Sequence, residues 1–151
     1  MRSIFLIFML FLTSPATAAP QILADCHLGK GHSFFEPSSL IPQKEAGWQN
    51  DGWSNAAARV VFMRDGDKLD LIVRDAVGTK SVVEDGGRGI RLPTNNSADL
   101  LFTTIYLETG TVETYLVVAQ KSGPSKLLWT SVRSGGNILG PKIGSYVGMC
   151  G

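Results

Sequence analysis

The stretch LLFTTIYLETGTVETYLVVAQK, from Leu100 to Lys121, contains the strongest structural signal in the chain. Two runs of aliphatic, β-branched and aromatic residues flank Glu108-Thr109-Gly110, which is typical of a β-hairpin. A two-residue loop at Thr109-Gly110 would require positive φ at a β-branched residue. A three-residue loop requires positive φ only at Gly110 and introduces a bulge, so we predict the three-residue loop.

This loop sets the register of the predicted hairpin. It places residues of the two runs opposite one another as Tyr106–Val112, Thr104–Thr114, Phe102–Leu116 and Leu100–Val118. The face predicted to enter the core then contains Leu100, Phe102, Tyr106, Leu116 and Val118. The other face is also largely apolar but includes Glu113, so we expect the strand pair to lie centrally in a sheet.

A second hairpin is predicted around Asp65-Gly66, a dipeptide preferred in type I′ turns. It joins strands expected from Ala57 to Arg64 and from Lys68 to Arg74. The predicted register places Phe62 opposite Leu69 and Val60 opposite Leu71, which gives one face an apolar centre.

The rest of the chain indicates an all-β fold. Turn-forming residues recur roughly every eight to twelve residues and no long helical period is present. We predict a single antiparallel domain of about eight strands, either a meander barrel or a sandwich. Its β core covers residues 57–151. Residues 19–56 are expected to form a loop-rich segment of the same domain, with a short strand near Ser33–Phe35 and a helical turn between Ser38 and Ala46.

Residues 1–18 have the features of a cleaved secretory signal peptide. Arg2 precedes an apolar run from Ile4 to Leu12, and Ala16-Thr17-Ala18 forms a cleavage site. We expect cleavage after Ala18 or Ala19. The apolar run of about nine residues is much shorter than the roughly 20 that a membrane-spanning helix needs. The sequence therefore predicts a periplasmic or secreted protein with no membrane span in the mature chain.

The charge of the chain gives no indication of a nucleic-acid partner. The formal net charge is +1, and removal of Arg2 with the signal peptide leaves basic and acidic residues in balance. We therefore expect no attraction to nucleic acid or to an anionic membrane. The oligomeric state is left open.

Two cysteines, Cys26 and Cys150, lie near the two ends of the mature chain. In an exported protein an even number of cysteines predicts a disulfide. The alternative is lipid attachment at Cys26, because Leu23-Ala24-Asp25-Cys26 resembles a lipobox. Asp25 occupies a position where a small residue is expected, and Cys26 is far from the apolar run, so we favour the disulfide.

No metal or cofactor is expected. Asp25, Cys26, His27 and His32 form a small group of possible ligands, but a zinc site needs three or four at defined spacing, and Cys26 is assigned to the disulfide. The acidic residues around Gly66 do not follow the calcium-loop pattern. Turn formation accounts for them.

No catalytic motif stands out in the chain. The G-x-S-x-G sequence of hydrolases is absent, and Ser33 beside His32 does not by itself constitute a triad. We assign no catalytic residue. The alternative function is a small periplasmic hydrolase that uses His32 with a nearby carboxylate.

The segment from Gly47 to Trp53 is the strongest candidate binding site. Trp48 and Trp53 lie in a polar, glycine-flanked stretch with Asp51 between them. These residues, together with His32, are predicted to form an aromatic platform for a ligand or partner protein. The competing interpretation is that both tryptophans close the open end of the core.

Several short motifs carry a resemblance to other proteins. They are Gly47–Gly52 after the early Cys26, Glu113–Leu116, Leu127–Thr130, and Tyr146 shortly before Cys150. In this layout the chain resembles a group of small uncharacterised secreted or periplasmic proteins of Gram-negative bacteria. The resemblance implies bacterial export and a β-rich domain, and it implies no activity and no site residues.

These observations together predict an exported, non-catalytic binding or interaction module. Its partner would be a small ligand, an envelope protein or a cell-wall component. Small exported β-domains include inhibitors of cell-wall hydrolases, which is an analogy at the level of the fold alone.

Overall fold

The computed structural model describes residues 19–53, 58–66, 68–75, 78–135 and 140–151. The predicted signal peptide, residues 1–18, lies outside the described residues. Within the described ranges, no helix is both long and apolar enough to span a membrane.

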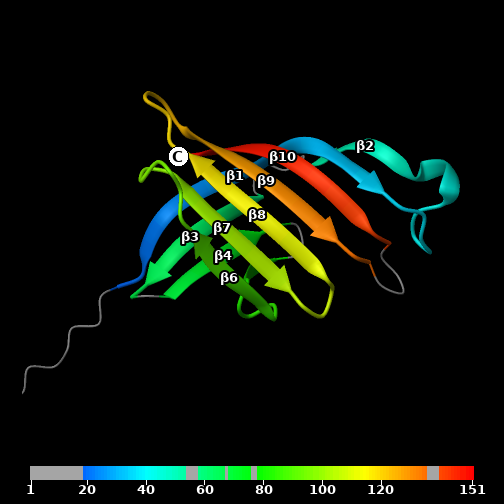
Figure 1. The fold of residues 1–151 in the computed structure, drawn as a ribbon, viewed down its shortest axis with the longest axis horizontal. Coiled ribbons are helices and arrows are strands. Elements are labelled where there is room, and N and C mark those ends of the chain that lie inside the picture. The colour runs from blue at the N-terminus through cyan, green and yellow to red at the C-terminus, as the bar shows by residue number, and fades with distance from the viewer. Residues whose placement is uncertain (1–18, 54–57, 67, 76–77, 136–139) are drawn as a thin grey trace, which may run out of the picture.

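The described chain forms one curled antiparallel sheet (Figure 1). This confirms the predicted all-β antiparallel fold, although the described residues form ten strands and not about eight. The strands are β1 (Gln21–Phe35), β2 (Gly47–Gly52), β3 (Arg59–Asp65), β4 (Lys68–Arg74), β5 (Thr79–Ser81), β6 (Gly87–Leu92), β7 (Leu100–Tyr106), β8 (Thr111–Val118), β9 (Ser125–Arg133) and β10 (Lys142–Cys150).

Two meanders meet at β1. The strand order is β5-β4-β3-β1-β10-β9-β8-β7-β6, and β2 adds to β1 outside this path. The curl brings β4 and β6 into contact. The concave side, here called the inner face, encloses the core, and the convex side is called the outer face (Figure 1).

The long strand β1 differs from the loop expected for this region. Its first half pairs with β3, its second half pairs with β2, and β10 pairs with it from Cys26 to Phe35. The glycines that suggested a loop are positions of close backbone approach. A Cβ atom at Gly29 would lie 1.7 Å from the carbonyl oxygen of Val147. The expected helical turn is present as the 3-10 helix η1, Gln43–Glu45.

The predicted disulfide between Cys26 and Cys150 is present. The two cysteines lie directly opposite each other on β1 and β10 and are buried. They are separated by 124 positions in the sequence, and closure of so long a loop contributes about 4–5 kcal/mol in the chain-entropy model. The bond therefore fixes the pair of strands at which the two meanders meet.

The register of the β3–β4 hairpin differs from the prediction by two residues. Phe62 pairs with Leu71 and not with Leu69, and Asp65 pairs with Lys68. Because side chains alternate with a period of two, an even shift keeps the same face toward the core. Val60, Phe62 and Leu71 are accordingly at most 1% exposed.

The register of the β7–β8 hairpin differs by one residue, and this has a larger consequence. Gly110 has φ +58° as predicted, but Tyr106 pairs with Thr111, so Leu107 also enters the loop. A shift of one residue turns β8 over. Tyr115 and Val117 are buried, and the predicted core residues Leu116 and Val118 are only partly buried.

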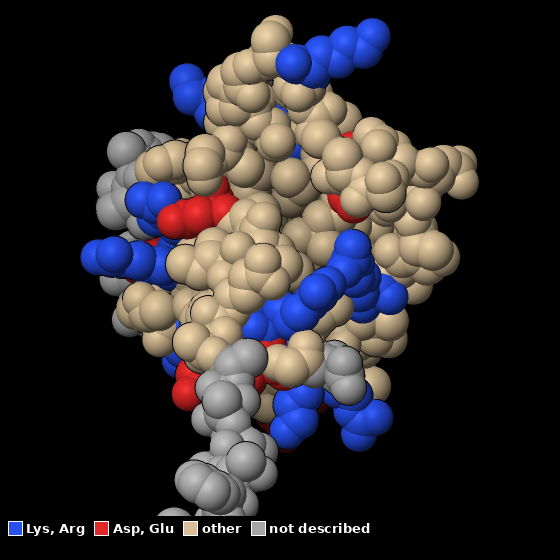
Figure 2. Space-filling view, turned by 90° about the vertical axis from the view of Figure 1, so that its left-hand side faces the viewer, with Lys and Arg blue, Asp and Glu red and all other residues tan. Residues whose placement is uncertain are grey.

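The charged side chains are spread over the surface. On the side of the molecule shown in Figure 2, most of the surface is uncharged, and basic side chains are more prominent than acidic ones.

Candidate functional site

A row of aromatic side chains crosses the inner face of the sheet. The registers of β10, β9, β8 and β7 place Tyr146, Trp129, Tyr115 and Phe102 next to one another. The ring centroids of Tyr146 and Trp129 are 4.3 Å apart, and those of Trp129 and Tyr115 are 5.6 Å apart. These stacked rings form a flat, apolar wall.

Trp53 extends this wall from the end of β2. Its backbone N–H donates to the Gly29 carbonyl at 3.0 Å, which holds the chain against β1. Its ring stacks on Trp129 with centroids 6.5 Å apart. Trp53 is therefore part of the inner aromatic wall.

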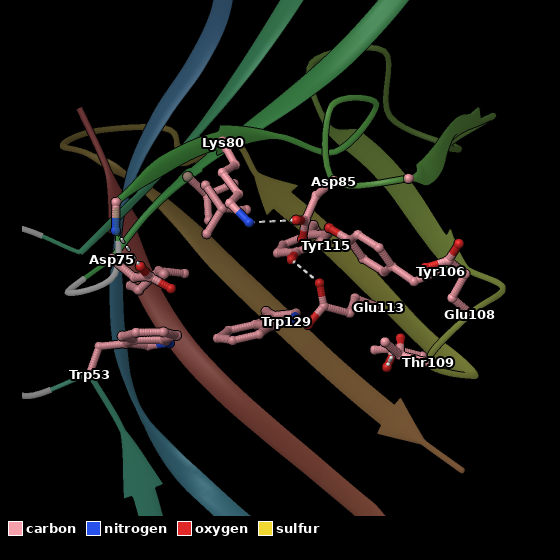
Figure 3. Close-up of a pocket in the computed structure, with 16 residues that line it drawn as sticks. Trp53, Asp75, Lys80, Asp85, Tyr106, Glu108, Thr109, Glu113, Tyr115 and Trp129 are labelled. Atoms are coloured by element: carbon pink, nitrogen blue, oxygen red, sulfur yellow. Dashed lines mark hydrogen bonds and ion pairs between the residues drawn. The ribbon is translucent and has the colours of Figure 1, made fainter. Parts of the chain in front are cut away.

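A cavity of about 530 Å³ lies against this wall, a volume within the usual range for small-molecule sites. Its apolar lining comes from Trp53, Trp129, Tyr115 and Tyr106, with Leu28, Val60 and Val73. Figure 3 shows that the labelled side chains converge from the residues just after β2 and β4, from the segment around β5, from β7 and the loop that follows it, and from β8 and β9. The site is thus assembled from distant parts of the sequence.

Glu113 projects into this cavity between Tyr115 and Trp129 (Figure 3). The Tyr115 hydroxyl donates to Glu113 Oε2 at 2.6 Å. Burial raises the pKa of Glu113, and hydrogen bonding from Tyr115 and Ser131 only partly offsets this effect. Among the described residues, no Lys, Arg or His nitrogen forms an ion pair with it. Glu113 is therefore a largely buried carboxyl group that has no cation of its own.

Two buried polar atoms close to Glu113 have no hydrogen-bond partner among the described residues. They are Trp129 Nε1 and Thr104 Oγ1. Thr104 is directly opposite Glu113 in the β7–β8 register. Its hydroxyl lies close enough to lower the pKa of Glu113, but the geometry of the two groups is not that of a hydrogen bond. An unpaired buried donor costs about 1–3 kcal/mol. Of these two residues, Trp129 lines the cavity, so its indole N–H is the donor available to a bound molecule.

The mouth of the cavity carries further charged groups. Lys80 Nζ lies 2.8 Å from Asp85 Oδ1, and Asp75 and Glu108 also contribute to the lining. Burial raises the pKa of Tyr106 to about 12, and the charge of Glu113 adds to this effect. Tyr106 is therefore a neutral hydroxyl at physiological pH.

A second polar cluster on the inner face surrounds Asp51. Its Oδ2 accepts hydrogen bonds from Ser33 Oγ and Tyr146 OH at 2.8 Å each, and Lys142 Nζ lies 2.7 Å away. Burial alone would raise the pKa of Asp51, but the bonds from Lys142, Ser33, Tyr146 and the Gly52 N–H outweigh it. They hold the pKa far below its ordinary value.

The Asp51 cluster does not provide a nucleophile. Ser33 is fully buried, so a substrate cannot reach its hydroxyl. Ser33 Oγ also lies 2.6 Å from Tyr146 OH. Because Asp51 is ionised, only the Ser33 and Tyr146 hydroxyl protons are available for the three contacts among Ser33 Oγ, Tyr146 OH and Asp51 Oδ2. The cluster holds β2 against β1 and β10.

The structure separates the four predicted site residues. Trp53 and Asp51 lie on the inner face, whereas Trp48 lies on the outer face, is 69% exposed, and contacts the edge of Phe34. His32 is also exposed on the outer face, opposite Asn50 and Ser145. The two tryptophans therefore do not form one platform.

A second, more open hollow of about 980 Å³ adjoins this region. His32, Asp51 and Trp53 contribute to its lining, together with residues of β9 and β10. Its lining comes from residues of both faces of the sheet, so it is a surface hollow around the β2 edge. Trp129 contributes to the lining of both cavities, whereas Glu113 and Tyr115 line only the first of these two.

The described residues contain no group of three or more His, Cys, Asp or Glu side chains arranged to hold a metal ion. Sequence reasoning missed Glu113 and Trp129 as site residues. A signal for Glu113 was present, because it is a lone carboxylate within an otherwise uncharged strand. The predicted register turned that carboxylate away from the core.

Comparison with known protein families, with curated proteins and with solved structures finds no match to this chain.

Proposed function

We propose that this chain is an exported, non-catalytic module that binds a small molecule in the cavity between β4, β7, β8 and β9. The observation that carries the proposal is the combination of an aromatic wall with a cation-free carboxyl group and a buried indole N–H that has no partner. Ligand sites are mostly apolar and contain a few convergent polar groups.

The same groups argue against a purely structural interpretation of the cavity. A core that served only stability would lose free energy through an unpaired Trp129 Nε1 and a largely buried carboxyl group that has hydroxyl donors and no cation among the described residues. A ligand that supplied partners to these atoms would recover that free energy. The Asp51 cluster provides the contrast, because its carboxylate already has all its partners within the protein.

No observation favours the alternative hydrolase. His32 lies on the outer face and the Asp51 side chain on the inner face, so this pair does not form an acid–base site. An envelope protein or cell-wall partner stays a prediction from the sequence.

The three tryptophans provide a direct test, because each indole N–H gives its own signal in a nitrogen–proton correlation spectrum. We would titrate the mature protein with three soluble probes that share a phenoxy group: 2-phenoxyethanol (neutral), phenoxyacetate (anionic) and choline phenyl ether (cationic). We expect at least one probe to shift the Trp53 and Trp129 signals saturably while the Trp48 signal stays in place.

A matched pair of variants checks the assignment. Trp53→Ala should weaken probe binding about tenfold, because it removes part of the aromatic wall. Trp48→Ala should leave the affinity unchanged. The proposal fails if no probe shifts Trp53 or Trp129 at millimolar concentration, or if Trp48 responds in their place.

A further inference from the structure

From the charge and the aromatic lining of this cavity we infer the chemical class of its ligand: a small organic cation with an apolar or aromatic body and an oxygen atom close to the cationic centre. This inference rests on the proposed function and adds the ligand's charge. Three features of the lining support it.

The first feature is a surplus of carboxyl groups. The described lining residues include four acids, Asp75, Asp85, Glu108 and Glu113, against one base, Lys80. Lys80 is already paired with Asp85. The whole chain is close to electrically neutral, so the surplus is a local property of this cavity. A cavity lined by one sign of charge concentrates ligands of the opposite sign.

The second feature is the position of the deepest carboxyl group. Glu113 lies between the Tyr115 hydroxyl, which donates to it, and the indole of Trp129, at the border of the aromatic wall (Figure 3). Aromatic faces attract cations, and this attraction strengthens when the site is shielded from water. An ammonium group beside Glu113 would contact both the carboxylate and the aromatic wall.

The third feature is the unpartnered indole N–H of Trp129, a residue that is only 7% exposed. This group can only donate a hydrogen bond, so it requires an acceptor. A cation alone supplies none. An ether, hydroxyl or carbonyl oxygen next to the cationic centre would accept from Trp129 while the cation contacts Glu113.

The protein's own cations do not fill this role. The charge of Lys142 acts electrostatically on Glu113, but its ammonium group is held by Asp51 at 2.7 Å. Lys142 also lies over the rings of Phe35 and Tyr146. The Asp51 site thus contains, within the protein, the same combination of carboxylate, aromatic rings and cation that a ligand would complete at Glu113.

The three phenoxy probes test this inference, because they share their aromatic and oxygen groups and differ in the charged group. We expect choline phenyl ether to bind at least tenfold more tightly than 2-phenoxyethanol, and phenoxyacetate to bind weakest. A tenfold preference is a typical contribution of one shielded charge-assisted contact. The quaternary ammonium does not titrate, so its charge is constant at every pH.

Glu113→Gln should remove the preference for the cation and leave the affinity for 2-phenoxyethanol within about twofold, because the amide keeps the shape and an acceptor for Tyr115. Glu108→Gln is the matched control at the exposed mouth. We expect it to weaken cation binding no more than about threefold, since exposed charges are screened.

The outcomes separate the two proposals. If 2-phenoxyethanol binds as tightly as the cation, or phenoxyacetate binds most tightly, the inferred ligand class is wrong while the binding function stands. A cation preference that persists in Glu113→Gln also contradicts it. If no probe shifts Trp53 or Trp129, the binding function itself fails. The order of the three affinities in the wild-type protein decides the question even if Glu113→Gln does not fold.

Discussion

Asp51 and Glu113 are two partly buried carboxyl groups on the inner face of the same sheet, and their surroundings are opposite. Asp51 receives Lys142, Ser33 and Tyr146 on a single oxygen, and its pKa is held far below the ordinary value. Glu113 has only hydroxyl donors, and burial raises its pKa. A carboxylate with its own cation stabilises the fold, whereas one without a cation costs stability and is open to a ligand.

The difference arises from where the basic residue lies in the register. Lys142 is the first residue of β10 and pairs with Phe35 at the end of β1, next to β2. From there its side chain reaches Asp51. Glu113 pairs with Ser131 on one side and Thr104 on the other, so the neighbouring strands offer it hydroxyl groups and no charge.

The largest effect is expected from removal of the cation of the Asp51 cluster. Lys142→Met should lower the free energy of unfolding by about 2–3 kcal/mol, because a half-buried carboxylate loses its counter-charge. The expected loss is smaller than the loss of stability on breaking a fully buried ion pair, because the Asp51 side chain is 27% exposed. Chemical denaturation measures the change. Lys126→Met on the outer face of β9 is the control, expected within about 0.5 kcal/mol, and equal effects of the two substitutions would contradict the role given to Lys142.

A smaller effect is expected from Asp51→Asn, which keeps the size of the side chain and removes its charge. The loss should be about 1–2 kcal/mol at pH 7. The folded pKa of Asp51 lies below its unfolded value of about 3.9, so its contribution is complete above that pH and is lost as the pH falls toward the folded pKa. The difference in the free energy of unfolding between Asp51→Asn and the wild type, measured by chemical denaturation, should therefore be smaller at pH 3 than at pH 7. A difference that does not depend on pH would exclude the charge as its origin.

The smallest effect, of opposite sign, is expected from Glu113→Gln without ligand. Because the folded pKa of Glu113 lies above its unfolded value of about 4.3, ionisation destabilises the fold at pH 7. That penalty disappears as the pH falls through the folded pKa to the unfolded one. The variant should thus be more stable than wild type by up to about 1 kcal/mol at pH 7, with the gain absent at pH 4. A loss of stability at pH 7 would mean that Glu113 is part of the scaffold, as Asp51 is.

The two hairpins indicate how far the sequence predicts this fold. In both, the strands and the turn glycine were correctly predicted, and the core face was correct for β3, β4 and β7 but not for β8. Alternation and positive φ are local properties of a strand and a turn. Both registers were wrong, since the loop length also depends on the strands that pair on the other side. The error of two residues in β3–β4 left the core face intact. The error of one residue in β7–β8 exchanged Tyr115 for Leu116 on the predicted core face and placed Glu113 on the opposite face.

The candidate site was predicted in part. Trp53 lines the cavity, but Trp48 lies on the opposite face of the sheet. Trp48 and Trp53 are an odd number of positions apart, so in an extended chain they must point to opposite sides. The prediction placed both on a loop, because the glycines around them suggested one. Gly52 allows close packing of β2 and β1, since a Cβ atom there would lie 2.6 Å from the Gly29 carbonyl oxygen.

The sequence by itself determined the all-β class, the pairing of its two cysteines and the turn at Gly110. The all-β class follows from composition and strand pattern, the disulfide from the presence of only two cysteines, and the turn from the tolerance of glycine for positive φ. Only the tertiary structure decided which carboxylate lies against a lysine and which lines a cavity. Asp51 and Lys142 are ninety-one positions apart in the sequence, and their contact depends on the order and register of strands that no local pattern encodes.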